Sequence, residues 1–94
     1  MKLFYNTWTI YENHNSKDIT HYFDNKEACD KQFETLHPCV HICAMQGEAE
    51  LTLEHIARIM FNSKNNHFNI KFNEQDQATI NEHIKTLKEN YLPF

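Results

Sequence analysis

Four side chains that commonly bind metals recur at every second position of one short stretch, namely His37, Cys39, His41 and Cys43. Zinc ligands lie about 2.0–2.3 Å from the ion. On a strand, which rises about 3.3 Å per residue, these four side chains would share one face but spread over roughly 20 Å. One ion could not bind all of them. We therefore interpret residues 39–45 as a buried strand in which cysteine packs as a small hydrophobe. We expect no metal and no cofactor.

The same residues leave one alternative open, a metal- or thiol-responsive module that uses Cys39, His41 and Cys43. Thiol catalysis needs an activated cysteine beside a base. Nothing around the three cysteines resembles a nucleophile elbow, and the single glycine, Gly47, excludes a glycine-rich phosphate loop. We therefore expect no catalytic residues and no enzyme activity.

Composition narrows the possible partners and the compartment. The chain has 94 residues, enough for a single domain over 1–94, and 40% of them are hydrophobic. The net charge of −4, with Arg58 as the only arginine, argues against direct binding to nucleic acid or to an anionic membrane. An odd number of cysteines, no signal-peptide pattern and no long apolar run favour a reducing, cytoplasmic setting.

The negative charge is concentrated in one part of the chain. Residues 18–57 contain eight acidic residues but only two lysines, Lys26 and Lys31. Four of the acids step by three, three and four residues along an expected helix over 25–36, which predicts one exposed acidic side: Asp24, Glu27, Asp30 and Glu34. We predict that this side binds a protein partner with a basic surface.

Aromatic residues define a second candidate surface. Half of them lie between residues 4 and 23. The alternation over residues 2–11 puts Phe4, Asn6, Trp8 and Ile10 on one face, and Leu3, Tyr5, Thr7, Thr9 and Tyr11 on the other. If no helix covers the second face, Tyr5 and Tyr11 become possible partner-binding anchors.

The hydrophobic patterns predict an α+β fold in the order ββαβαβα, with a mainly antiparallel sheet of about four strands and three helices. Expected strands cover 2–11, 18–23, 39–45 and 67–72, and expected helices cover 25–36, 53–62 and 74–91. We expect Asp24 with Glu27 to form a capping box, and Thr52 and Asn73 to cap the other two helices.

One segment resembles a known motif. LTLEHIARIM, residues 51–60, resembles the first helix of a helix-turn-helix motif, which implies a DNA-binding regulator as a second alternative. The segment that follows alternates like a strand, whereas the motif requires a recognition helix. The chain as a whole resembles, in size, charge and missing chemistry, the small inhibitors of phages and mobile elements, such as anti-CRISPR and anti-restriction proteins. The leading prediction is thus a small stand-alone binding protein, with a homodimer left open.

Overall fold

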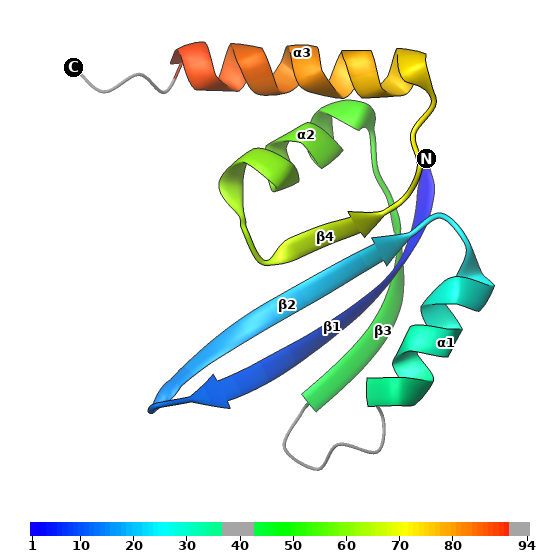
Figure 1. Cartoon of the computed structure of the whole chain (residues 1–94), viewed down its shortest axis with the longest axis vertical. Coiled ribbons are helices and arrows are strands. Elements are labelled where there is room, and N and C mark those ends of the chain that lie inside the picture. Colours follow the sequence, from blue (N-terminus) through cyan, green and yellow to red (C-terminus); the bar gives the residue numbers. More distant parts are fainter. Residues whose placement is uncertain (37–42, 91–94) are drawn as a thin grey trace.

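A computed structural model describes residues 1–36 and 43–90 and confirms the predicted fold class (Figure 1). The elements follow the order ββαβαβα: β1 (Lys2–Glu12), β2 (Asn15–Phe23), α1 (Lys26–Leu36), β3 (Cys43–Glu50), α2 (Leu53–Asn62), β4 (Asn66–Asn69) and α3 (Glu74–Asn90). The sheet has the strand order β3-β1-β2-β4. Strand β1 runs antiparallel to β2 and β3, whereas β4 runs parallel to β2, so the sheet is mixed.

The first two strands form a long hairpin closed by two residues. Asn13 and His14 have φ angles of 47° and 69°. Two consecutive positive φ angles identify a type I′ turn, whose twist matches that of the strands. Because the turn is this tight, β2 begins at Asn15 rather than at residue 18 as predicted.

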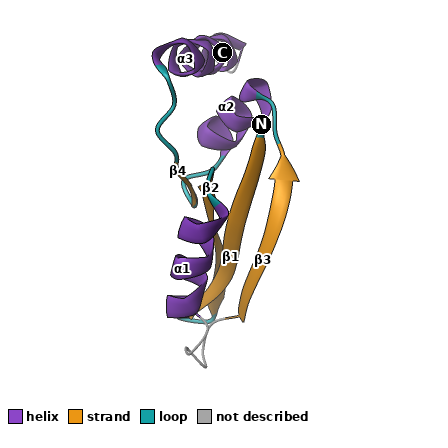
Figure 2. Ribbon diagram, turned by 90° about the vertical axis from the view of Figure 1, so that its right-hand side faces the viewer, coloured by secondary structure: helices purple, strands orange, loops and turns teal. Residues whose placement is uncertain are grey.

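The apolar core lies at one end of the sheet. Leu3 from β1, Ile56 and Ala57 from α2, and Ile80 from α3 are fully buried together. The backbone of α3 lies close to α2 and not to the strands that the structure describes, so α3 reaches the core through side chains such as Ile80. Figures 1 and 2 show α2 and α3 stacked beyond one end of the sheet, with α1 alone lying along one of its faces.

Two of the three predicted helix caps are confirmed. The Thr52 hydroxyl accepts a hydrogen bond from the His55 amide (3.1 Å), and the Asn73 side chain accepts one from the Asp76 amide (2.7 Å). The predicted capping box at Asp24 is wrong. The Asn25 side chain instead accepts hydrogen bonds from the amides of Glu27 and Ala28, so α1 begins at Lys26.

Two strand boundaries differ from the prediction. Strand β3 continues to Glu50 instead of ending at residue 45, while residues 39–42 of the predicted strand lie outside the described residues. The predicted burial is wrong for the described part, because β3 is an edge strand on which Cys43 and Met45 are exposed. Glycine and glutamate are rare in strands but acceptable on a sheet edge, where charge discourages unwanted pairing. Strand β4 ends at Asn69, yet Ile70 and Phe72 still pack against the core, as the alternation over 67–72 suggested.

The molecule is flat. Its extents are 42 × 35 × 17 Å and its radius of gyration is 15.1 Å, larger than the roughly 12 Å expected for a compact chain of this length. No helix among the described residues has the length and apolar character needed to span a bilayer. A flat molecule exposes a large share of its residues, so the positions of the charged side chains decide which surfaces can bind a partner.

Candidate protein-binding surface

Helix α1 is attached to the sheet through a buried asparagine. Asn6 of β1 has an exposed fraction of 0%. Its amide nitrogen donates to the Cys29 carbonyl (2.8 Å) and to Gln32 Oε1 (3.0 Å), and its amide oxygen accepts from the Cys29 thiol (3.2 Å). Both ends of the Asn6 amide are therefore used, which fixes how α1 sits on β1.

The other two long strands add polar contacts to the same helix. From β3, the Gln46 amide donates to Asp30 Oδ1 (2.8 Å) and to Cys29 Sγ (3.6 Å). From β2, the His21 ring nitrogen Nδ1 lies 2.8 Å from the Gln32 amide nitrogen. Burial raises the pKa of the Cys29 thiol, which favours the protonated form that donates to Asn6. Hydrogen bonds from three strands thus hold α1 in place.

The four predicted acidic residues of this region are not equivalent. Glu27 and Glu34 are exposed on the outer side of α1, and Asp24 is exposed in the bend before it. Asp30 is half-buried and turned toward the sheet, where Lys26 contacts it at 2.9 Å. The hydrogen bond from Lys26 lowers the pKa of Asp30. The predicted stripe therefore consists of two outward carboxylates, with Asp30 serving mainly to position the helix.

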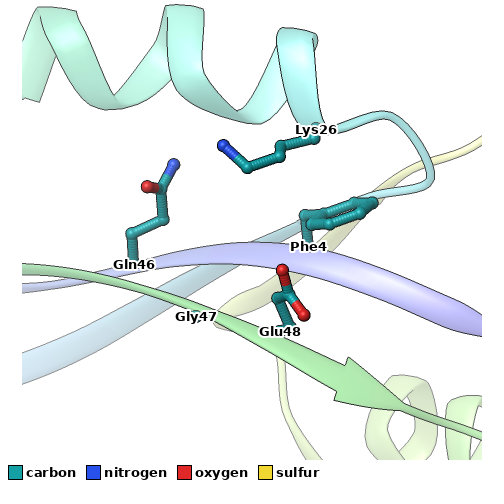
Figure 3. A pocket seen from close by; sticks show the side chains of 5 residues that line it. All are labelled: Phe4, Lys26, Gln46, Gly47 and Glu48. Carbon is teal, nitrogen blue, oxygen red and sulfur yellow. The ribbon is translucent and has the colours of Figure 1, made fainter.

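A hollow lies beside α1, between this helix and the sheet (Figure 3). Its volume is about 180 Å³, and five residues line it: Phe4, Lys26, Gln46, Gly47 and Glu48. Figure 3 shows Lys26 reaching from α1, and Gln46 and Glu48 rising from β3, toward the same space. Glu48 and Glu50 alternate with small residues on β3 and are both exposed. The lining of the hollow therefore contains one carboxylate, that of Glu48, and one ammonium group, that of Lys26.

Tyr5 and Tyr11 lie on the opposite face of the sheet from α1. They belong to the face of Leu3 and Thr7, whereas α1 contacts the face of Asn6. Tyr11 is 64% exposed, and Met45 is 69% exposed. Tyr5 is half-buried, because its ring lies against Gly47 of the neighbouring strand and its centroid lies 5.9 Å from that of Tyr22. The predicted tyrosine anchors therefore form no common surface with the acidic residues.

Only some of the residues considered for a metal or thiol site lie within the part of the chain that the structure describes. His37, Cys39 and His41 lie outside them, and Cys43 is the exposed first residue of β3. Across residues 1–36 and 43–90, no three histidine, cysteine or acidic side chains gather as metal ligands would. After α2 comes strand β4, where a helix-turn-helix motif would place its recognition helix.

Several contributors to this surface were missed in the sequence. Gln46 and Glu48 lie beyond the predicted strand 39–45, although Gln46, Glu48 and Glu50 show the two-residue period of a strand. No sequence pattern marks Phe4 and Lys26 as part of this surface. They reach the hollow only because β1 pairs with β3 and α1 docks on the sheet.

Comparison with known proteins adds no relatives. No family model matches the chain, and neither the curated proteins nor the solved structures contain a significant match.

Proposed function

We propose that this protein is a non-enzymatic binding protein whose acidic side, formed by α1 and β3, docks on a basic surface of a protein partner. The observation that supports it best is that Glu27 and Glu34 are exposed on the outer side of α1, the helix that lies on the face of the sheet carrying Glu48 and Glu50. Glu48 and Glu50 pair with Lys2 and with the N-terminal amine. Within the described residues, Glu27 and Glu34 take part in no ion pair, so their charge is available to a partner.

The way α1 is attached supports this role. A binding surface gains affinity when it is ordered before the partner arrives. Hydrogen bonds that α1 makes with Asn6, Gln46 and His21 fix it against three strands, which orders the carboxylates on its outer side. Negative potential on such a surface speeds encounter with a positive partner and excludes negative ones.

The proposed partner is a protein whose basic groove serves nucleic acid, and the proposed action is inhibition by occupying that groove. This is the mode expected of small acidic inhibitors such as anti-CRISPR and anti-restriction proteins. The proposal includes no direct contact with nucleic acid or membrane. Tyr11 and Met45 lie on the far face of the sheet and take no part in the proposed contact.

Affinity capture with matched baits tests the proposal. The test bait carries Glu27→Lys and Glu34→Lys. The control bait carries Glu82→Lys and Glu89→Lys, which change the net charge by the same amount on exposed positions of α3. Asp30 is left unchanged because it holds Lys26 and Gln46.

From extracts of the native host, wild type and control should capture the same protein, and the test bait should lose it. Mass spectrometry identifies the protein, and a low-salt gel shift checks for duplex DNA binding. Equal capture by the test and control baits, or strongly salt-dependent binding of the purified protein to DNA, would contradict the proposal.

A further inference from the structure

The hydrogen-bond chain beneath α1 has a fixed direction. A backbone carbonyl can only accept, so the Cys29 carbonyl requires the amide nitrogen of Asn6 to face it. The second hydrogen of that nitrogen then requires Oε1 of Gln32 to accept. Gln32 is therefore oriented with its amide nitrogen toward Nδ1 of His21, 2.8 Å away.

This direction decides the state of His21. Its Nδ1 must accept the hydrogen bond from Gln32, which requires the neutral ring with its proton on Nε2. Asn69 of β4 places a second amide nitrogen 3.3 Å from the same Nδ1. A proton on Nδ1 would point at the amide nitrogen of Gln32, whose orientation the rest of the chain fixes. Turning Gln32 over would relieve this contact only by bringing its amide nitrogen against that of Asn6.

The surroundings of His21 also disfavour a positive charge. Gln32 faces it from α1, Trp8 from β1, and His67 and Asn69 from β4. The ring centroid of His67 lies 4.6 Å away, and among the described residues His67 is the only titratable group that acts on His21. Burial, and then the repulsion of His67, lower the pKa of His21 below its ordinary value of 6.5.

We propose that His21 makes the attachment of α1 to the sheet sensitive to pH, because a proton on Nδ1 breaks the chain that runs from His21 through Gln32 and Asn6 to Cys29. The neutral ring holds the helix. Because the folded pKa lies below the unfolded one, this stabilisation is complete above about pH 6.5 and is lost as the pH falls toward the folded-state pKa. The α2–α3 core, which contains no such chain, keeps its packing over this range.

Hydrogen exchange followed by NMR, corrected for the intrinsic pH dependence of exchange, tests the proposal. Between pH 7.5 and 5.5 we expect protection of the α1 amides of Gln32 and Phe33 to fall, by at most about tenfold for each unit by which the His21 pKa is depressed. Protection of the α3 amide of Ile80 should change less than twofold.

Two variants distinguish the protonation of His21 from a general effect of acid on the protein. Gln32→Glu keeps the acceptor for Asn6 and offers a carboxylate to His21, so the His21 pKa should rise above 6.5 and acid should no longer loosen α1. His21→Gln keeps an acceptor that does not titrate, so the response should disappear. His55→Gln, on the exposed side of α2, is the control and should behave as wild type. If α1 protection in wild type is independent of pH, or if all three variants respond like wild type, the proposal is wrong.

Discussion

The two helical parts of this molecule are attached to the same sheet by different forces. Helices α2 and α3 meet the sheet through Leu3, Ile56, Ala57 and Ile80, which are fully buried and apolar. Helix α1 is held by hydrogen bonds with the side chains of Asn6, His21 and Gln46. Apolar burial has no direction and depends little on pH, whereas a hydrogen-bond chain sets one orientation and fails when one member changes. The comparison separates the part that stabilises the chain from the part that orients its acidic surface.

The largest effect should come from the apolar part. Ile56→Ala removes a fully buried side chain and should lower the free energy of unfolding by about 2–5 kcal/mol. Urea denaturation measures it. Ile59→Ala on the same helix, at a half-buried position, is the matched control and should cost less. Equal losses would mean that the core does not lie where the structure puts it.

The polar part should show a smaller but sharply localised effect. Asn6→Ala leaves the Cys29 carbonyl and Gln32 without their donor, at about 1–3 kcal/mol for each buried group left unsatisfied. Hydrogen exchange should rise in α1 more than in α3. The exposed Asn81→Ala on α3 serves as control. A uniform rise over both helices would remove the distinction between the two parts.

On the face that α1 does not cover, Gly47 tests how Tyr5 is held. A Cβ at this position would overlap the outer end of the Tyr5 ring, so the ring must turn aside in Gly47→Ala, at about 0.5–1.5 kcal/mol for a strained side-chain torsion. In a Tyr5→Ala background the same change should cost almost nothing. A double-mutant cycle by thermal unfolding measures the coupling. Additive losses would show that Tyr5 does not lie on Gly47.

The smallest effect should come from the hairpin turn, away from both helical parts. His14 has a positive φ of 69°, which glycine adopts without strain. We therefore expect His14→Gly to raise the free energy of unfolding by about 0.5–1 kcal/mol. The pH response of α1 should stay unchanged, as NMR of the same variant would report. Destabilisation would contradict the type I′ assignment.

Much of the fold was predictable because its signals are local. The alternation in β1 and the caps at Thr52 and Asn73 each involve residues close in sequence, and the structure confirms them. The misplaced cap shows the limit of such signals: Asp24 and Asn25 are both good cap residues, and only the geometry selects the second. Residues 46–50 of β3 were not predicted as strand because their amino acids have low strand propensity. Pairing with β1 outweighs that propensity.

The candidate site was harder to predict because its contacts are distant in sequence. Asn6 was visible as a polar residue on an otherwise apolar face, but its partner Cys29 lies 23 residues away. Equally, the alternation put Tyr5 and Tyr11 on a common face without showing that α1 would dock on the other one. Propensity and periodicity describe single elements, whereas this surface arises from the way α1 packs on three strands.

The proposal that the acidic side of α1 binds a basic partner is tested most directly by calorimetry. The captured partner is titrated into wild type, into the Glu27→Lys, Glu34→Lys variant and into the Glu82→Lys, Glu89→Lys control. Reversing two contacting charges should weaken binding by about tenfold or more, and the control should bind within about twofold of wild type. Equal weakening in both variants would show that only the net charge of the protein matters. Unchanged binding of the α1 variant would place the interface elsewhere on the molecule.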